Sequence, residues 1–433
     1  MKRAVITIGL GFGDCGKGAT VDFLCRHLGA SLVVRYSGGS QSGHNVELPD
    51  GRRHTFSQFG AGTLAGVPAH LGPRVIINPS ALPREADHLR SLGIDDPFAL
   101  LTVHPQCLVS TFWHQTVNQL RELARGAGRH GSCGHGIGET RSYWLRYGDD
   151  AIFARDLQDA AVLNEKLELL RQRLFLDLQE FIERVPTAEL REYDLLTLAP
   201  AATSESLLEV GSSLRLQDRV PFTSGTLIFE GAQGVLLDEW RGFHPHTTWS
   251  TVTAHHALEM ALECGVEELC VLGLTRAYTT RHGAGPFPTY DAALTAALPD
   301  PGNPHNPWQG GFRVGWLDLP LLKYAAAVAG SELDGLAVSN LDQLETRHVK
   351  VCTEYAGVRL EPSPGPSLAW QARLTDSLRN ARPLLHDTTP TELLGMLGEI
   401  APVVIEGRGP THTARSATSL PFRKRKGTAP HGF

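Results

Sequence analysis

The sequence predicts an α/β protein with a mainly parallel central sheet, helices on both faces and a phosphate loop after its first strand. Short apolar stretches that end in small-residue loops alternate with stretches of helical periodicity. The first apolar stretch enters the glycine-dense turn of residues 4–19, AVITIGLGFGDCGKGA. No linker or repeat divides the 433 residues, so we expect one doubly wound domain over 1–433, with looser excursions at 185–225 and 361–378.

The first turn has the spacing of a phosphate loop. Gly11, Gly16 and Lys17 fit the frame G-x-x-x-x-G-K, in which backbone N–H groups cradle phosphates and the lysine reaches their outer oxygens. Gly18 stands where a Ser or Thr usually holds Mg²⁺, so another ligand must replace that hydroxyl. Asp14 lies inside the loop, and a carboxylate beside polyphosphate needs an intervening cation. Asp14 is therefore a candidate metal ligand, base, or both; the alternative is an ordinary glycine-rich turn.

The segments after this loop continue the alternation. Residues 20–29 show helical spacing, and residues 31–36 form a second buried apolar run. The small-residue loop 37–45 follows that run. Because ligands of open α/β sheets gather at the carboxyl ends of strands, we expect His44 to face the same site as Asp14. The alternative is a surface histidine.

Later segments repeat the pattern. Strands are expected within 226–234, 268–278 and 334–342, each followed by a small-residue or polar loop. Residues 114–125 and 163–184 have the periodicity of helices.

Composition excludes several classes of function. The net charge of −6 argues against general nucleic-acid binding, and the basic run 423–426 is more typical of a solvated segment. Seven scattered cysteines without a C-x-x-C pair indicate neither a zinc site nor a disulfide framework. No apolar run approaches the roughly 18 residues of a membrane span, and no signal peptide is evident. We expect a cytoplasmic enzyme with small-molecule substrates and no nucleic-acid or membrane partner.

Two motifs together carry a resemblance to a known family. GFGDCGKG (11–18) followed by VVRYSGGSQSGHN (33–45) resembles the signature pair of adenylosuccinate synthetases, W-G-D-E-G-K-G and N-A-G-H-T. The chain differs from that pair at Phe12, Cys15 and Gln41. Seven further matching blocks follow in the family's order: 74–82, 131–142, 229–238, 277–289, 315–319, 338–342 and 407–410.

The resemblance implies a GTP-dependent ligase of purine nucleotide biosynthesis. GTP would phosphorylate the 6-oxygen of IMP, and the amino group of L-aspartate would displace the phosphate to give adenylosuccinate. By match to the family, Asp14 would take the N1 proton and His44 would stabilise the 6-oxygen and the transferring phosphoryl. Lys17 and Mg²⁺ would neutralise phosphoryl oxygens, the metal being held by Asp14 and the Gly43 carbonyl.

The same match implies the nucleotide contacts. For GTP they are Gly13, Cys15, Gly16, Lys17, Gly18, Asn340, Asp342, Gly407, Arg408 and Gly409. For IMP they are Gln41, Gly43, Cys133, Arg146, Gln233 and Thr248. Cys133 replaces a phosphate-binding threonine, and Arg146 would reach the nucleotide of a partner subunit, which implies a homodimer.

The base-recognition segment is altered in this chain. The family's T-K-x-D becomes residues 339–342, Ser-Asn-Leu-Asp. Asp342 can still accept hydrogen bonds from guanine, but loss of the lysine leaves GTP or ATP open. The alternative role for Asp342 is that of a capping or turn aspartate.

The expected amine-donor loop departs furthest from the family. Its T-T-G-R-R-R-R-T becomes PWQGGFRV at 307–314, so the donor-loop candidates are Gln309, Gly310, Gly311 and Arg313. Bidentate Arg–carboxylate pairs select a dicarboxylic amine, and only one arginine remains. Either Arg313 and a neighbour such as Arg281 recover aspartate binding, or the amine or the 6-oxopurine nucleotide differs. A third hypothesis is a non-catalytic GTP or IMP sensor, against which the presence of both Asp14 and His44 argues.

Overall fold

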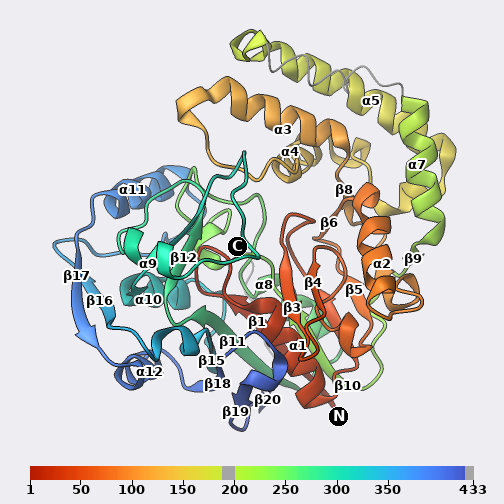
Figure 1. Ribbon diagram of the computed structural model, residues 1–433. Helices are drawn as coiled ribbons and strands as arrows, with labels where there is room; N and C mark the ends of the chain where they lie inside the picture. The colour runs from red at the N-terminus through yellow and green to blue at the C-terminus, as the bar shows by residue number, and fades with distance from the viewer. Residues whose placement is uncertain (188–199, 425–433) are drawn as a thin grey trace.

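A computed structural model describes residues 1–187 and 200–424 (Figure 1). Within these residues eleven strands form one sheet, in the order β19-β18-β15-β11-β1-β10-β2-β5-β7-β9, with β20 beside β11. The strands are β1 (Lys2–Gly9), β2 (Leu32–Arg35), β5 (Ala69–Leu71), β7 (Leu101–Val103), β9 (Arg215–Leu216), β10 (Gly225–Glu230), β11 (Glu268–Arg276), β15 (Gly335–Ser339), β18 (Val403–Gly407), β19 (Arg415–Ala417) and β20 (Arg423–Lys424). All pairs are parallel except β18–β19 and β11–β20. The prediction of a mainly parallel sheet is therefore confirmed.

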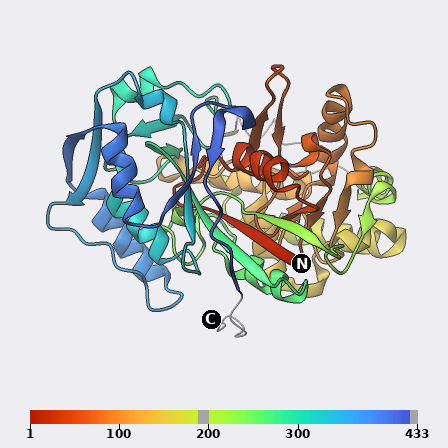
Figure 2. The same ribbon diagram turned by 90° about the horizontal axis from the view of Figure 1, so that it is seen from below.

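The core lies on both faces of this sheet. Strand β1 lies in the middle of the sheet, between β10 and β11 (Figure 2). Its side chains alternate: Val5 packs in one cluster with Val21 of α1 (Lys17–Leu28), and Ile6 packs in the other with Ala257 of α8 (His255–Glu263). A strand buried on both faces gives a continuous apolar run, which explains the sequence pattern of residues 4–10. Helices cover both faces, as predicted.

A helical layer stands over the β7–β9 end of the sheet, at the upper right of Figure 1. It consists of α3 (Phe112–Arg125), α4 (Ile137–Tyr147), α5 (Ala160–Gln179) and α7 (Pro200–Ser213). Helix α5 buries leucines at successive turns of one face: Leu163, Leu167, Leu170, Leu174 and Leu178. These leucines belong to the same apolar cluster as one face of the sheet, and the layer forms one wall of the cleft described below.

The remaining elements are short. They are the helices α2 (Leu82–Ser91), α9 (Ala292–Ala297), α10 (Leu319–Ala327), α11 (Leu368–Arg379) and α12 (Pro390–Gly398), and the small sheets β3 (His44–Glu47) with β4 (Arg53–Phe56), β6 (Ile76–Ile77) with β8 (Leu108–Val109), β12 (Thr279–His282) with β13 (Phe312–Gly315), and β14 (Leu317–Asp318) with β16 (Val349–Tyr355) and β17 (Pro383–Thr388). Among the residues that the structure describes, no helix is long and apolar enough to cross a membrane.

Two expectations about local structure need correction. The three expected helices begin two to three residues earlier than predicted: small or polar residues open α1, whereas the aromatic residues Phe112 and Trp113 open α3. Helix α5 also ends at Gln179, five residues before the predicted end at 184. The stretches 185–225 and 361–378 are not merely loose: the first contains α7, and the second contains most of α11. Ser367 caps α11 by accepting from the Trp370 N–H, and Gln371 and Thr375 are buried on its inner face, which hides its amphipathic pattern. Residues 188–199 of the first stretch lie outside the described residues.

Candidate active site

One cleft of about 620 Å³ lies where the phosphate loop, the start of β3 and the helical layer meet. It brings together residues that the sequence places far apart. The predicted site residues that line it are Gly13, Asp14, Lys17, Gln41, Gly43, His44, Cys133, Arg146, Gln233, Thr248 and Gln309. Cys15, Gly16, Gly18, Asn340, Asp342, Gly407, Arg408, Gly409, Gly310, Gly311 and Arg313 do not line it.

The phosphate loop connects β1 to α1 through a run of left-handed backbone conformations. Gly13, Asp14 and Gly16 have φ values of 93°, 52° and 79°. Gly16 has no alternative, because a Cβ there would lie 2.5 Å from the Ser339 hydroxyl. Arg276 holds the non-glycine Asp14 in place by donating Nε–H to its carbonyl at 2.5 Å. The loop is thus fixed against the ends of β11 and β15.

The packing around Gly18 explains why this loop has no serine or threonine after its lysine. A Cβ at residue 18 would lie 2.4 Å from the carbonyl oxygen of Asn45 and 2.7 Å from the carbonyl carbon of His44. Strand β3 therefore packs directly against the first turn of α1. A hydroxyl cannot be placed at residue 18, so a metal ligand has to come from another residue of the cleft.

Lys17 is the first residue of α1, and its side chain is buried between the loop and the end of β10. Its ammonium group donates a hydrogen bond to the carbonyl of Gln233, a residue that itself has a left-handed backbone (φ 51°). Burial lowers the pKa of Lys17. A bound polyphosphate would offset this desolvation by supplying negative charge.

His44 and Asp14 line the same cleft, as the order of strands and loops predicts. The Nδ1 atom of His44 lies 2.5 Å from Oε1 of Glu230, the last residue of β10. Burial lowers the pKa of His44 to about 4, so the imidazole is neutral and donates Nδ1–H to the carboxylate. Its Nε2 atom is buried without a hydrogen-bond partner. Glu230 therefore fixes the orientation of the imidazole ring through Nδ1, and Nε2 remains available to a ligand.

Glu230 is a site residue that the sequence prediction missed. It is fully buried and also accepts a hydrogen bond from the Ala61 N–H at 3.0 Å. Burial opposes its charge, but the neighbouring His44 and Arg35 outweigh this effect and lower the pKa of Glu230. An acidic residue that ends a buried strand, in FEGAQG, was the available signal, since such a carboxylate needs a partner.

Other polar atoms in the cleft also lack partners. Oε1 of Gln41 and Oε1 of Gln233 are buried and accept no hydrogen bond from the described residues. Leaving a buried polar group unsatisfied costs roughly 1–3 kcal/mol. With Nε2 of His44, Oγ of Ser42 and Nη2 of Arg281, five such atoms lie at one site. This arrangement is typical of a surface that a polar ligand completes.

A second group of predicted residues lies behind the phosphate loop, at the ends of β15 and β18. Asn340 takes a left-handed conformation (φ 63°), and Asp342 follows in a short 3₁₀ turn. One carboxylate oxygen of Asp342 accepts from Gln343 Nε2 at 2.8 Å, whereas Oδ1 is buried without a partner. Arg408 forms ion pairs with Glu345 and Glu406. Gly407 packs against the guanidinium of Arg415, which leaves no space for a Cβ.

Two cysteines and one arginine occupy predicted nucleotide positions. Cys15 is buried, donates its thiol hydrogen to the Gly13 carbonyl at 3.2 Å, and has its pKa raised by burial. Burial also raises the pKa of Cys133 to about 11, so neither thiol is ionised at neutral pH. Arg146 is exposed at the cleft edge and pairs with Asp177 at 2.8 Å.

Arg313 of the donor loop and Arg281 both hold the neighbouring loop 283–286. Arg313, on β13, donates to the carbonyls of Gly283 and Gly285. Arg281, opposite it on β12, donates to Ala284 and Pro286 at 3.0 and 2.8 Å. Both guanidinium groups thus brace the loop 283–286. Arg313 does not line the cleft, so its guanidinium serves this loop.

Arg281 does line the cleft. Its guanidinium lies 3.9 Å from the ring centre of Phe12 in the phosphate loop, and its Nη2 is buried without a partner. Burial, together with the nearby Arg313, lowers the pKa of Arg281 to about 9, which still leaves it charged at neutral pH. It is therefore a buried cation with an unused donor in the cleft.

Comparisons with known proteins agree with this fold and site. The family model for adenylosuccinate synthetase matches residues 6–377. The adenylosuccinate synthetase of Halothermothrix orenii is 34% identical over 377 residues, 83% of each chain. That of Neisseria gonorrhoeae is 31% identical over 361 residues, 82% of this chain and 81% of the relative.

Solved structures show the same fold at lower identity. The fully ligated adenylosuccinate synthetase of Plasmodium falciparum superposes with a TM-score of 0.76 at 20% identity, covering 96% of this chain and 99% of its own. The succinoaminodeoxyadenylate synthetase of cyanophage S-2L, bound to dGMP and to dATP as energy donor, superposes with a TM-score of 0.61 at 16% identity, covering 96% of each chain.

These findings define a GTP-dependent ligase of the α/β class with a phosphate loop. The chain belongs to the adenylosuccinate synthetase family. Membership supports GTP-dependent conversion of IMP and aspartate to adenylosuccinate. It does not favour a different amine, a different purine nucleotide or a non-catalytic sensor.

Proposed function

We propose that Asp14, Lys17 and His44 carry out the activation step of adenylosuccinate synthesis in the cleft described above. The observation that carries this proposal is the meeting of all three residues in one cleft, with His44 oriented by the buried Glu230. Asp14 removes the N1 proton of IMP, the 6-oxygen attacks the γ-phosphorus of GTP, and GDP leaves. The amino nitrogen of aspartate then attacks C6, phosphate leaves with the former 6-oxygen, and a proton is lost from the nitrogen.

His44 stabilises the phosphoryl group through Nε2. In the protein without ligands its imidazole is neutral, because burial holds its pKa near 4. A bound phosphoryl group adds negative charge on the Nε2 side while Glu230 remains on the Nδ1 side, and both favour the imidazolium. The same nitrogen can then donate its proton to the 6-oxygen as the bond to C6 breaks.

The residues present fit a magnesium ion. The Asp14 carboxylate and the Gly43 carbonyl line one cleft and are the hard oxygen ligands that Mg²⁺ prefers. They compensate for the hydroxyl that Gly18 cannot carry. When bound, the ion neutralises charge on the phosphates of GTP.

GTP would lie with its phosphates on residues 13–18 and its base at the ends of β15 and β18. The unpartnered Oδ1 of Asp342 supports a guanine base, which offers two neighbouring N–H donors, over adenine, which does not. Asn340, Gly407, Arg408 and Gly409 form the surroundings of that base.

IMP would occupy the opposite side of the cleft. Gln41, Cys133, Gln233 and Thr248 line the cleft and would contact its phosphate and sugar. Arg146 would contact the IMP phosphate of a second copy of the chain, in a homodimer. Its exposure at the cleft edge supports this role. We further propose that the enzyme acts in the cytoplasm; its seven cysteines are all free thiols, as in proteins of reducing compartments.

Aspartate would be bound with fewer arginines than the family pattern provides. The unused Nη2 of Arg281 and the Gln309 amide are the donors that support this assignment. Each charge-assisted contact contributes roughly 1.5–3 kcal/mol, so a loop with fewer of them should have a KM for aspartate about tenfold or more above that of a four-arginine relative.

The test measures phosphate release from GTP with IMP, with and without aspartate, and determines the mass of the purine product. We expect IMP-dependent phosphate release and a product with the mass of adenylosuccinate. Release that does not depend on IMP, or a product lacking the aspartyl group, would refute the proposal. A mass measurement in solution that finds a fully active monomer would remove Arg146 from the site.

A further inference from the structure

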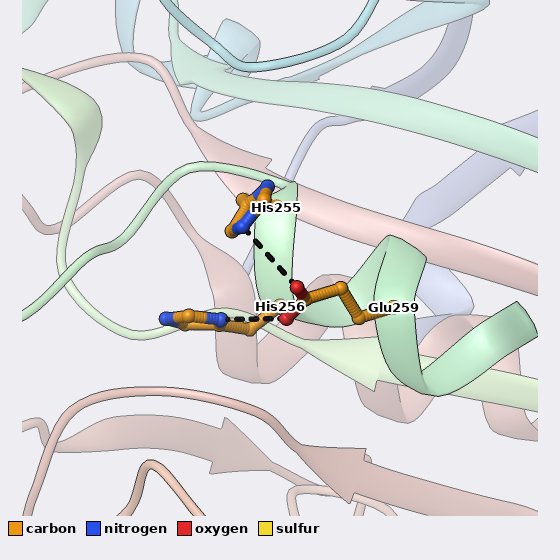
Figure 3. Close-up of side chains that lie close together, drawn as sticks. All are labelled: His255, His256 and Glu259. Atoms are coloured by element: carbon orange, nitrogen blue, oxygen red, sulfur yellow. Dashed lines mark hydrogen bonds and ion pairs between the residues drawn. The ribbon is translucent and has the colours of Figure 1, made fainter. Parts of the chain in front are cut away.

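A cluster of three side chains lies outside the active-site cleft, at the start of α8. His255 and His256 are the first two residues of this helix, and Glu259 lies one turn further on. Both imidazoles point toward the same carboxylate (Figure 3). Nε2 of His255 lies 3.3 Å from Oε1 of Glu259, and Nδ1 of His256 lies 3.1 Å from Oε2.

The spacing of these residues on the helix produces the convergence. Glu259 follows His255 by four residues and His256 by three, so all three project from neighbouring positions of one turn. One ligand atom from each lies within 4.8 Å of the others. With metal bonds of about 2.0–2.1 Å, neighbouring ligands of a tetrahedral zinc ion are about 3.3–3.5 Å apart. The separations of the ligand atoms have an upper limit of 4.8 Å, so the side chains would rotate toward one another to hold an ion.

We propose that His255, His256 and Glu259 bind a divalent transition-metal ion of the Zn²⁺ class. Two imidazoles and one carboxylate are a donor set for zinc and related borderline ions. Mg²⁺ instead selects oxygen ligands, so this site is chemically distinct from the one at Asp14 and Gly43. Three protein ligands leave one position for water or another small ligand.

The access route suits metal binding. His256 lines a cavity of about 380 Å³. The side chains of His255, His256 and Glu259 are 31%, 16% and 45% exposed, which gives an ion a route from solvent.

The alternative is that these side chains form only a pair of hydrogen bonds within the first turn of α8. In that case each imidazole donates to Glu259 and no ion is held. The two cases differ in one measurable property, which is the binding of one metal ion per chain that depends on all three residues.

The experiment titrates Zn²⁺ into the full-length chain, without a histidine tag and stripped of metal with EDTA, in competition with a chromophoric chelator. The variants are His255→Ala, His256→Ala and Glu259→Gln. His348→Ala is the matched control, because His348 also pairs with a single carboxylate, Asp387, at 2.8 Å on an exposed surface. Co²⁺ absorption in the visible region reports the number and type of ligands.

We expect one Zn²⁺ per wild-type chain, with affinity reduced about tenfold or more in each of the three variants and unchanged in His348→Ala. Millimolar Mg²⁺ should not compete. The proposal is overturned if wild-type protein binds no stoichiometric Zn²⁺, or if the three variants bind it as tightly as wild type. The circular dichroism spectrum of each variant shows whether the chain keeps its overall fold.

Discussion

Two glycines, Gly18 and Gly311, show how differently the two ends of the active site are constrained. At Gly18 a Cβ would meet the backbone of β3 at 2.4 Å, whereas at Gly311 it would meet nothing within 4 Å. The phosphate end is therefore built by the packing of main chain against main chain. The donor end is an open loop whose side chains can change without moving the fold. This difference explains how the chain differs so much from the family at 307–314 while preserving the phosphate loop.

Gly18 and Gly311 both depart from an expected motif, but for different physical reasons. Where the backbone is packed, a residue that departs from the general phosphate-loop pattern, such as Gly18 in place of Ser or Thr, reports a constraint of the fold, and the family motif W-G-D-E-G-K-G has glycine at the same position. A substitution in open space, such as glycine for arginine at residue 311, reports a change in ligand contacts. Replacing Gly18 by serine should therefore disturb the fold, whereas replacing Gly311 by arginine should change contacts with a ligand.

The largest effect is expected from Asp14→Asn, which removes the base of the activation step. Proton transfer by a positioned group contributes roughly 10²–10⁴-fold, so kcat should fall by that amount while GTP binding remains measurable. IMP-dependent phosphate release measures the first quantity and equilibrium titration with GTP the second. Unchanged phosphate release would show that the phosphate end does not perform the chemistry assigned to it.

Restoring the usual hydroxyl by Gly18→Ser should inactivate the enzyme rather than improve it. The new side chain would push β3 and His44 away from α1, at a cost of roughly 1–3 kcal/mol in stability and a fall in kcat of about 100-fold. Thermal unfolding and phosphate release measure both. Gly311→Ser is the control and should stay close to wild type. A gain in activity for Gly18→Ser would reverse our interpretation of this position.

A smaller effect, with a distinctive pH dependence, is expected from Glu230→Gln. The carboxylate raises the pKa of His44, so its removal lowers that pKa, and the imidazolium is then lost at a lower pH. The alkaline limb of the kcat–pH profile should move to lower pH, with kcat at pH 7 reduced about 10–100-fold. A uniform loss at every pH would mean that Glu230 has only a structural role.

The smallest change concerns the donor end. Gly311→Arg adds a guanidinium where there is space and no positive φ to oppose it, and one new charge-assisted contact should lower the KM for aspartate by about tenfold. Gly365→Arg is the matched control, because a Cβ at Gly365 is equally unobstructed and this residue does not belong to the donor loop. An unchanged KM would indicate that aspartate is bound elsewhere.

The sequence was sufficient for the phosphate end because its signals are local. Asp14, Lys17 and His44 stand in short motifs at strand ends, and a parallel sheet brings such ends together. Glu230 was missed because its partner His44 lies 186 residues away. Periodicity and spacing do not encode tertiary contacts. They therefore could not predict the lack of space for a side chain at Gly18, the bracing of 283–286 by Arg281 and Arg313, or the buried inner face of α11.

The hydrogen bond from Lys17 to the Gln233 carbonyl has a consequence for how the substrates bind. In the function proposed above, Lys17 contacts GTP and Gln233 contacts IMP. Phosphates that draw the ammonium group toward GTP release that carbonyl, and an IMP molecule that repositions the Gln233 backbone releases the lysine. The two nucleotides should therefore bind with positive cooperativity, and each should strengthen the other by the same factor, since heterotropic linkage is reciprocal. Titration of IMP at zero and at saturating GTP measures that factor, and equal affinities would show that the contact transmits nothing.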